Sequence, residues 1–482
     1  MQQALRPLIT VIGATGTGKS KLAVDLALAL NGEIINSDAM QMYRGLDVIT
    51  NKHPLEERMG IPHHLMDFLN PEEAWKIGQW LSIALTKIED IRKRGKVPIV
   101  VGGTHYYVQS LLFRESIQDF EDKLDNGDYS GHREAITAKF PILEAPTSEI
   151  LAELQRRDPV MANRWHPNDR RKIQRSLEIC LTTSRKASDL YAEEAANNAG
   201  KSTARFSNIL FWVHASDEVL ASRLKGRVDK MIEQGLFGEL DELYKLYKEN
   251  KDEMDTSSGI WQSIGWKEFV PYLVAKDTLD NDGGTNAEAK KTLENELDRL
   301  KAEGIDKTNV ATRHYSKSQV KWIRIKLLNK LLADVASLPD GGMYLLDTSD
   351  LSRWNDTVRD PAVRIAQAFL NPDIPNENLP KPTEIATLPT DLLKPHKKDM
   401  ATDRSLWVNN TCEHCHVTAV TQELWNKHIN GRAHRQVVKR KMKREQIELL
   451  RVLRVASSEA AAPADVSYKE ASPDTQTTET LL

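Results

Sequence analysis

A glycine-rich run near the N-terminus has the residue types and the spacing of a phosphate-binding loop. The run fits the pattern G-x-x-x-x-G-K-[ST] and consists of Gly13, Ala14, Thr15, Gly16, Thr17, Gly18, Lys19 and Ser20. In such a loop the backbone N–H groups curl around an anion, the lysine reaches the outer phosphate, and the final hydroxyl can ligate Mg²⁺. A turn without a ligand is the less favoured alternative, because an apolar β-branched run at 8–12 precedes the loop and an apolar-periodic helix at 22–30 follows it.

The residues around this loop lack the acid that a kinase or a nucleotide hydrolase needs. Such enzymes hold their magnesium with an acid at the end of a second strand. The strand expected at 97–101 ends in Gly102-Gly103-Thr104, and a later one at 209–213 also ends without Asp or Glu. The acid that does follow a strand is Asp38. Because strand ends form the ligand crevice of an α/β sheet, Asp38 and Thr104 should face the bound group, although by pattern alone Asp38 could be a helix N-cap.

Four residues near the C-terminus have the spacing of a C2H2 zinc site. They follow the pattern Cys-x₂-Cys-x₁₂-His-x₅-His and are Cys412, Cys415, His428 and His434. Two thiolates on a knuckle and two imidazoles on a helix can close a tetrahedron around Zn²⁺. The third cysteine, Cys180, lies in a helical pattern and is expected to be a core thiol.

The helix of this finger continues into a basic stripe. No acid interrupts residues 424–444, and the stripe consists of Lys427, Arg432, Arg435, Lys439, Arg440, Lys441, Lys443 and Arg444. Such a stripe is typical of a phosphate-facing surface, so we predict an RNA clamp. The same run could alternatively be a nuclear import signal.

Further motifs make the chain resemble the tRNA dimethylallyltransferases. They occur in that family's order over about residues 8–330, and after the phosphate loop they lie at 35–44, 60–65, 101–107, 168–178, 227–231, 262–268 and 312–319. The long His–His spacer of the finger resembles matrin-type or double-stranded-RNA-binding fingers, and a C-terminal finger is a feature of eukaryotic members. A eukaryotic source is therefore expected.

This resemblance implies a prenyltransferase. The family moves a dimethylallyl group from dimethylallyl diphosphate to N6 of adenosine 37 of tRNA, with the target base taken out of its stack. The resemblance implies that Asp38 is the general base and that Thr104 lies near the reacting amine. It implies that the phosphate loop binds the diphosphate and that Lys19, Ser20 and Arg227, with Mg²⁺, stabilise its departure.

The resemblance also implies a set of tRNA-contacting residues. They are Asp38, Ala39, Met40, Gln41, Thr104, Arg171, Lys172, Ile173, Gln174, Arg175, Ser263, Ile264, Gly265, Trp266, Lys267, Glu268, Lys317, Ser318, Gln319, Lys321, Trp322 and Arg324. Without the resemblance, the basic helices among them would be interpreted as solvated faces. Bacterial members commonly carry Lys-Arg-Gln at 317–319, so one phosphate contact fewer is expected here. Residues 116–131 and 277–284 look like insertions relative to compact bacterial members.

The elements that position these residues predict an α/β fold with a parallel-sheet phosphate-loop core, an all-helical insertion domain and a C-terminal C2H2 zinc finger. We place the first part of the catalytic core at 1–114 and its second part at 206–370. The insertion at 115–205 holds no convincing strand. The resemblance to the family implies that it grips the anticodon stem. A proline-rich linker at 371–405, a finger with its basic helix at 406–450 and a disordered tail at 451–482 complete the predicted organisation.

Composition sets wider bounds on these predictions. The chain has 482 residues, with 66 Lys+Arg, 69 Asp+Glu and 3 Cys. The length suggests about three domains, and so few cysteines exclude a disulfide scaffold. No apolar run reaches the roughly 18–20 residues of a spanning helix, and no signal or transit peptide is evident. We therefore expect a cytoplasmic protein without a membrane partner, with mitochondrial and nuclear pools as further options. A monomer that binds one tRNA is the default expectation, and the oligomeric state stays open. The net charge of −3 does not suggest nucleic acid, but an average over the chain hides local basic runs.

Three other functions stay open at this point. The chain could prenylate free adenine nucleotides, although the insertion, the tRNA-type motifs and the finger argue against this. It could be a phosphate-loop kinase or NTPase with an RNA-binding finger, although the missing acid argues against it. It could also be a non-enzymatic RNA- or chromatin-binding protein.

Overall fold

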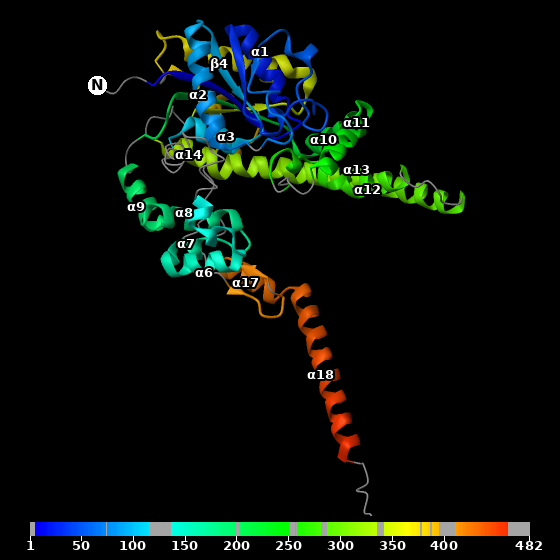
Figure 1. Cartoon of the computed structure of the whole chain (residues 1–482). Coiled ribbons are helices and arrows are strands. Elements are labelled where there is room, and N and C mark those ends of the chain that lie inside the picture. The colour runs from blue at the N-terminus through cyan, green and yellow to red at the C-terminus, as the bar shows by residue number, and fades with distance from the viewer. Residues whose placement is uncertain are drawn as a thin grey trace, which may run out of the picture. The chain divides into compact units, whose positions relative to one another are not determined.

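The computed structural model divides the chain into two compact units. One comprises residues 1–141 and 188–398, and the other comprises residues 142–187 and 399–482. Figure 1 shows the whole chain. The structure describes residues 5–73, 75–114, 136–198, 202–250, 256, 258–280, 287–334, 342–375, 378–385, 388–394, 410–415 and 417–460. The expected insertion at 116–131 lies outside the described residues, as does much of the one at 277–284.

A six-stranded parallel sheet forms the centre of the larger unit. Its strand order is β3-β2-β4-β1-β5-β6, and every pair in it is parallel. The strands are β1 (Pro7–Gly13), β2 (Gly32–Asn36), β3 (His63–His64), β4 (Val97–Val101), β5 (Ser207–His214) and β6 (Met343–Asp347). The predicted α/β parallel-sheet core is therefore confirmed.

Helices cover both faces of this sheet. Along β1, Ile9 and Val11 pack in one cluster with α1 (Lys19–Leu30) and α15 (Asp360–Leu370). Their neighbours Leu8 and Ile12 pack in the opposite cluster with α2 (Ile77–Lys93), α3 (His105–Leu112) and α14 (Leu328–Ala333). Burial on both faces explains why the strands are continuous apolar runs instead of alternating ones.

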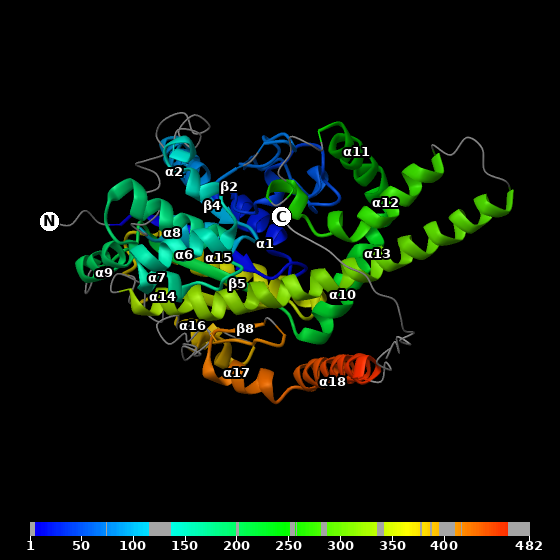
Figure 2. The same ribbon diagram turned by 60° about the horizontal axis from the view of Figure 1, so that its bottom comes forward.

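A long helix, α13, runs beside the sheet and beyond it (Figure 2). It spans Ala287–Trp322 and continues through a π-helical turn, Ile323–Leu327, into α14. It packs against α10 (Asp217–Glu233) and α12 (Trp266–Asp280), and α11 (Leu236–Glu249) packs against both of these helices. Gly304 allows a close approach to α12, because a Cβ there would lie 2.5 Å from the Phe269 ring.

The stretch from 115 to 205 is helical in the part that the structure describes. Its helices are α6 (Thr147–Arg157), α7 (Pro159–Arg164), α8 (Arg170–Thr183) and α9 (Ala187–Asn198). Asp158 caps α7 through the Met161 N–H at 3.1 Å, and Asp169 caps α8 through the Lys172 N–H at 3.4 Å. Cys180 is buried on α8, as expected.

The proline-rich stretch is tied to the core over much of its length. It contains α16 (Pro382–Ile385) and a short turn at Thr390–Leu393. Leu379 is buried, Leu388 and Leu392 pack on the core, and the Tyr344 hydroxyl donates to the carbonyl of Pro380 at 2.9 Å. The expected linker at 371–405 therefore does not run free over its described part, because apolar residues between the prolines find partners.

The finger has two short strands and two helices. Strands β7 (Asn410–Thr411) and β8 (Thr418–Ala419) pair antiparallel, and α17 (Gln422–Ile429) and α18 (Arg432–Ala460) follow. Helix α18 continues past residue 450, so the first part of the expected disordered tail is helical; residues 461–482 lie outside the described residues. None of the helices in the described part of the chain is long and apolar enough to cross a membrane.

Candidate active site

Three loops meet at the carboxyl edge of the sheet. Because β2, β4 and β1 are adjacent and parallel, the segments that follow them lie side by side. These segments are 37–41, 102–104 and the phosphate loop, 13–20. Asp38, Thr104 and the phosphate loop, which the sequence predicted to face one bound group, therefore lie together at this edge, as expected for a parallel α/β sheet.

The phosphate loop has the backbone conformation that its glycines predict. Gly16 and Gly18 have φ values of 83° and 89°, in the left-handed region that other residues rarely adopt. The Thr17 hydroxyl donates to the carbonyl of Ala14 at 2.8 Å, which closes the loop on itself. The Lys19 ammonium donates to the same carbonyl at 2.8 Å.

Two half-buried cations lie at this loop. The guanidinium of Arg227, from α10, donates to the Thr15 hydroxyl. Burial lowers the pKa of Lys19 to about 8 and that of Arg227 to about 10, while the charge of Asp38 raises both. Both groups remain protonated at neutral pH. Together they outweigh the single carboxylate beside them, so the site favours an anion.

Asp38 faces these cations from the end of β2. The Asn36 side chain accepts from the Asp38 N–H at 2.9 Å and donates to the Asp38 carbonyl at 3.0 Å, which fixes the turn. One carboxylate oxygen accepts from the Met40 N–H at 3.1 Å. Asp38 therefore accepts from the first N–H of the short turn Met40–Met42, whose N-cap position is Ala39, and it also faces the site. Burial raises the pKa of its carboxyl, while the Met40 N–H and the nearby charges of Lys19 and Arg227 lower it.

The loop after β4 approaches Asp38 closely because two of its residues are glycines. A Cβ at Gly102 would lie 2.3 Å from the Ser37 hydroxyl, and one at Gly103 would lie 2.8 Å from an Asp38 carboxylate oxygen. The next residue, Thr104, accepts from the Ala39 N–H at 3.0 Å through its hydroxyl. The structure thus brings Thr104 beside the segment that carries Asp38.

Helix α13 joins the phosphate loop to the β4 loop. Gln319 accepts from the Thr15 N–H at 2.8 Å and donates to the Gly103 carbonyl at 3.0 Å. Gln319 is buried, so its position suits bracing the site more than contacting tRNA. The Tyr315 hydroxyl also donates to the Gly103 carbonyl, at 3.4 Å.

Sequence reasoning assigned no role to two residues of this site. One is Tyr315, whose ring is partly exposed while its hydroxyl end points inward to Gly103. The other is His105, whose Nε2 accepts from the Gly13 N–H at 3.4 Å. Burial, followed by the charge of Lys19, lowers the pKa of His105 to about 3, so it is neutral. Tyr315 lies inside the motif at 312–319 and His105 inside the motif at 101–107, and this position was the sequence feature that could have pointed to them.

The residues expected to contact tRNA divide by exposure. In α8, Arg171 and Lys172 are exposed, whereas Ile173 is buried, Gln174 donates to the Leu143 carbonyl at 2.8 Å and Arg175 pairs with Glu178 at 2.8 Å. The exposed residues near the end of α13 are Lys317, Ser318 and Lys321, and the half-buried ones are Trp322 and Arg324.

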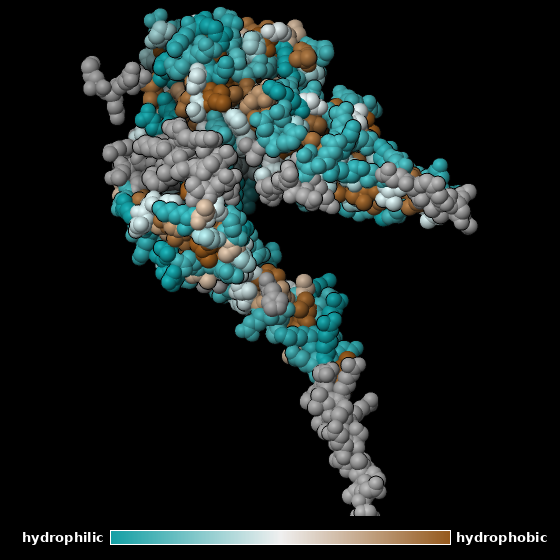
Figure 3. Space-filling model, viewed as in Figure 1, coloured by the Kyte–Doolittle hydropathy of each residue, from teal (hydrophilic) through white to brown (hydrophobic). Residues whose placement is uncertain are grey.

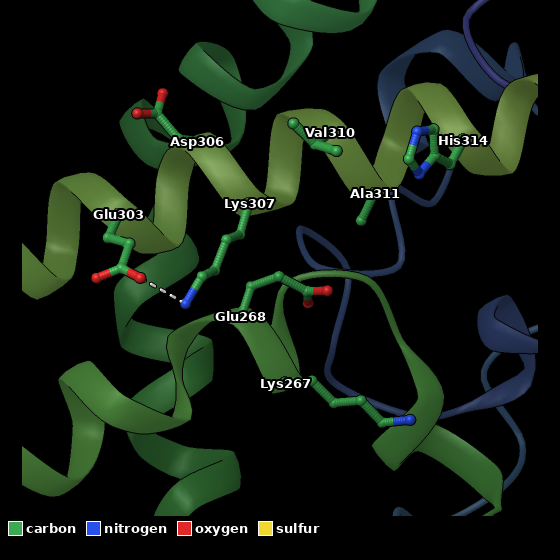
Figure 4. Close-up of a pocket in the computed structure, with 8 residues that line it drawn as sticks. All are labelled: Lys267, Glu268, Glu303, Asp306, Lys307, Val310, Ala311 and His314. Carbon is green, nitrogen blue, oxygen red and sulfur yellow. Dashed lines mark ion pairs between the residues drawn. The ribbon is translucent and has the colours of Figure 1, made fainter. Parts of the chain in front are cut away.

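The segment at 263–268 borders a pocket of mixed charge. Ser263, Gly265 and Trp266 are buried and Ile264 is half-buried, while Lys267 is exposed. Figure 4 shows the pocket, of about 460 Å³, which is lined by Lys267, Glu268, Glu303, Asp306, Lys307, Val310, Ala311 and His314. Lys307 is already paired with Glu303 at 2.7 Å, so its charge is largely balanced. Nearer Asp38, the Gln41 amide donates to the Asn51 carbonyl at 2.9 Å, while Ala39 and Met40 are half-buried.

The four predicted ligands of the finger converge. The ligand atoms of Cys412, Cys415, His428 and His434 lie within 4.8 Å of one another. His434 Nδ1 lies 3.5 Å from Cys412 Sγ and 3.4 Å from Cys415 Sγ, and His428 Nε2 is buried without a hydrogen-bond partner. These spacings suit ligands that share one tetrahedral metal ion at about 2.0–2.3 Å. The donor set therefore fits a structural metal.

The basic stripe of the finger is open to solvent. All eight of its Lys and Arg residues, from Lys427 to Arg444, are exposed. Hydrophilic residues predominate over the start of α18 in Figure 3. The charges are therefore available to an external polyanion.

Comparison with known proteins agrees with this geometry. The family model described as IPP transferase matches residues 41–326. The tRNA dimethylallyltransferase of Saccharomyces cerevisiae is 36% identical over 92% of this chain and 94% of that protein, and that of Schizosaccharomyces pombe is 37% identical over 92% and 98%. The human tRNA dimethylallyltransferase is 33% identical over 91% of this chain and 87% of that protein.

A solved structure leads to the same conclusion. A eukaryotic dimethylallyltransferase acting on tRNA matches with a TM-score of 0.70 and 33% identity, over 92% of this chain and 100% of that one. The family match covers more than half of the chain, and the relatives match over nearly all of it. The chain therefore belongs to the tRNA dimethylallyltransferase (IPP transferase) family.

Proposed function

We propose that this protein transfers a dimethylallyl group from dimethylallyl diphosphate to N6 of adenosine 37 in tRNA. The observation that carries the proposal is the presence of two half-buried cations, Lys19 and Arg227, close to one half-buried carboxylate, Asp38. An excess of positive charge suits a diphosphate leaving group, and a carboxylate facing it suits a base. The activity for which the relatives are named, dimethylallyl transfer to tRNA, supports the same reaction.

The reaction can be written on these residues. The N6 amine of the adenine attacks C1 of the dimethylallyl group, and the bond from C1 to the diphosphate oxygen breaks. The amine proton passes to the Asp38 carboxylate, which compensates for the poor nucleophilicity of an amine conjugated with the ring. The electron pair leaves on the diphosphate, where Lys19, Arg227 and the loop N–H groups stabilise the new charge. Thr104, which accepts from the Ala39 N–H, would orient the segment next to the amine.

Magnesium would assist the leaving group. Ser20 follows Lys19 in the first turn of α1, where its hydroxyl would be a ligand of Mg²⁺. Bound there, the ion would neutralise part of the charge that develops on the diphosphate. Neither β4 nor β5 ends in an acid, so the arrangement differs from that of a nucleotide hydrolase.

The finger would serve the same substrate. We propose that Cys412, Cys415, His428 and His434 hold Zn²⁺, and that the exposed basic stripe binds tRNA phosphates. Stoichiometric zinc in purified protein, lost together with tRNA affinity in Cys412→Ser, would support this role. We further propose a monomer acting on one tRNA, with a cytoplasmic pool and additional mitochondrial and nuclear pools.

A direct assay tests the proposed function. Purified protein is incubated with dimethylallyl diphosphate and unmodified tRNA that bears adenosines at positions 36–38. Mass spectrometry of the digested tRNA should find N6-isopentenyladenosine at position 37. Absence of any prenylated nucleoside would refute the proposal, and faster prenylation of AMP or ATP than of tRNA would shift it to free nucleotides. Hydrolysis of ATP stimulated by tRNA, without prenylation, would favour an NTPase.

A further inference from the structure

The glycines of the phosphate loop are each backed by a different part of the larger unit. A Cβ on Gly13 would lie 2.3 Å from the Val213 carbonyl oxygen of β5, and one on Gly16 would lie 3.0 Å from the Leu224 side chain of α10. A Cβ on Gly18 would lie 2.9 and 3.0 Å from two ring carbons of Trp354. The loop is thus held from outside at three points, and an indole ring supplies the third.

Trp354 contacts more than Gly18. Its indole N–H donates to the Asp25 carboxylate of α1 at 2.7 Å. The Lys21 ammonium lies 4.6 Å from the centre of its ring, within the range of a cation–π contact, and also pairs with Asp25 at 3.2 Å. One side chain therefore joins the last glycine of the loop to the first two turns of the helix that follows it.

The segment that carries Trp354 is itself firmly placed. Trp354 is only 5% exposed and begins a π-helical turn, Asn355–Arg359, that leads into α15. It packs in the same core cluster as Val358 of that turn and Leu22 of α1. Trp354 and the turn that follows it lie beyond residue 326, where the match to the family model ends.

We propose that Trp354 is a positioning residue of the diphosphate site. By packing on Gly18 and fixing α1 through Asp25, it holds the left-handed glycine and the helix N-terminus in the conformation that presents their N–H groups to an anion. Glycine reaches many backbone conformations, so a contact that selects one of them lowers the cost of ordering the loop on binding. The inference rests on the proposed function, in that diphosphate is taken as the ligand of the loop.

A binding measurement without tRNA tests this inference. Trp354→Phe removes the indole N–H and the outer ring atoms that reach Gly18, but keeps an aromatic ring in the core. Titration calorimetry with inorganic pyrophosphate and Mg²⁺ should show about ten-fold weaker binding, the order expected when a loop must be ordered on binding. The KM for dimethylallyl diphosphate should rise by a similar factor, while the KM for tRNA stays unchanged.

The matched control is Phe369→Leu in α15. Phe369 belongs to the same buried cluster, so its truncation should lower the melting temperature comparably. It should leave pyrophosphate affinity unchanged. If Trp354→Phe lowers the melting temperature but binds pyrophosphate as tightly as the parent protein, Trp354 is a core residue only and the inference is overturned.

A second variant covers the case in which Trp354→Phe folds poorly. Asp25→Ala leaves the ring in place but removes the acceptor of the indole N–H, and about three-fold weaker pyrophosphate binding is expected from a partly freed indole. Unchanged affinity in well-folded Asp25→Ala would count against the inference in the same way. If the parent protein binds pyrophosphate but prenylates no tRNA, the proposed function alone is refuted. If the parent prenylates tRNA and both variants bind pyrophosphate as tightly as it does, only the role of Trp354 is refuted.

Discussion

Asp38 is the residue on which the proposed chemistry depends most. Its carboxyl is half-buried near Lys19 and Arg227, and the turn built by Asn36 and Met40 fixes its direction. The charges of its two neighbouring cations oppose the effect of burial, which raises its pKa.

We predict that Asp38→Asn abolishes most turnover while sparing tRNA binding. The amide keeps the shape and the bond from the Met40 N–H but cannot accept a proton, so single-turnover rates should fall by roughly 10²–10⁴-fold. Filter binding should find the tRNA affinity within a few-fold of the parent protein. Asp241→Asn, which removes an exposed partner of Lys276, is the control and should leave both values unchanged. Wild-type rates in Asp38→Asn would exclude Asp38 as the base.

The pH dependence of kcat/KM for dimethylallyl diphosphate should be bell-shaped. Burial raises the pKa of Asp38, so as pH falls the base is protonated and activity is lost sooner than for an ordinary carboxylate. Burial lowers the pKa of Lys19 to about 8, so as pH rises through about 8 the lysine loses its charge and diphosphate binding weakens. Because bound diphosphate favours protonated lysine, the alkaline fall in kcat should lie at higher pH than the fall in kcat/KM.

Lys19→Arg separates the two limbs of this profile. A guanidinium keeps its proton at every pH tested, so the alkaline fall should move upward or disappear, while the acidic fall stays in place. The absolute rate of this variant is expected to drop, since the fork of arginine does not reproduce the point charge of lysine. A profile that superimposes on that of the parent would show that Lys19 does not control the alkaline limb.

At the scale of elements, the site depends on the contact of α13 with two strand-end loops. Gln319 accepts from Thr15 in one loop and donates to Gly103 in the other, across sequence separations of 304 and 216 residues. The amide thus fixes the distance between the segment that would hold diphosphate and the segment beside Asp38. A change in α13 can therefore alter chemistry at both loops at once.

We predict that Gln319→Ala lowers kcat/KM for dimethylallyl diphosphate by roughly ten- to hundred-fold. Leaving a buried donor or acceptor unpaired costs about 1–3 kcal/mol, and each 1.4 kcal/mol corresponds to ten-fold. Steady-state kinetics should show both a raised KM for dimethylallyl diphosphate and a lowered kcat. Val310→Ala, an exposed change on the same helix, should be silent. An effect on the KM for tRNA alone would return Gln319 to the role of a tRNA contact.

Strands that carry a clear local sequence pattern were predicted correctly. The runs at 8–12, 97–101 and 209–213 became β1, β4 and β5, because apolar β-branched runs suit a sheet buried on both faces. The two residues of β3 are too few to form a pattern. The phosphate loop, Asp38 and Thr104 could be placed together because parallel strand ends share one edge.

Contacts between distant segments could not be predicted in the same way. Nothing local to Gln319 or Tyr315 shows that both meet Gly103, and nothing local to Trp354 shows that it backs Gly18. These pairings depend on how whole helices pack on the sheet. The proline count at 371–405 likewise gave no sign that Leu379 is buried in the core.

On the scale of the whole molecule, the charge of −3 is a cancellation between regions. Exposed Lys and Arg gather at the start of α8, near the end of α13 and along the finger helix, while acids are spread elsewhere. Binding of a polyanion depends on the local groups within about a Debye length, roughly 8–10 Å at physiological salt. A near-neutral total is therefore compatible with tight RNA binding.

The basic stripe of the finger gives the sharpest test of that view. A variant in which Lys439, Arg440, Lys441, Lys443 and Arg444 are all changed to Gln should bind tRNA more weakly at low salt and with a flatter salt dependence. With fewer phosphate contacts, fewer counterions are released from the tRNA when the protein binds. The slope of log Kd against log salt should fall by roughly 0.7–0.9 for each contact removed. Fluorescence anisotropy with labelled tRNA over a range of KCl concentrations measures both effects.

The control, Lys290→Gln with Lys291→Gln, neutralises exposed charges at the start of α13 and should leave the slope unchanged. The turnover rate at saturating tRNA should also stay near that of the parent, since the core that carries Asp38 is untouched. An unchanged salt slope in the five-residue variant would refute the clamp and leave the stripe to another role, such as nuclear import.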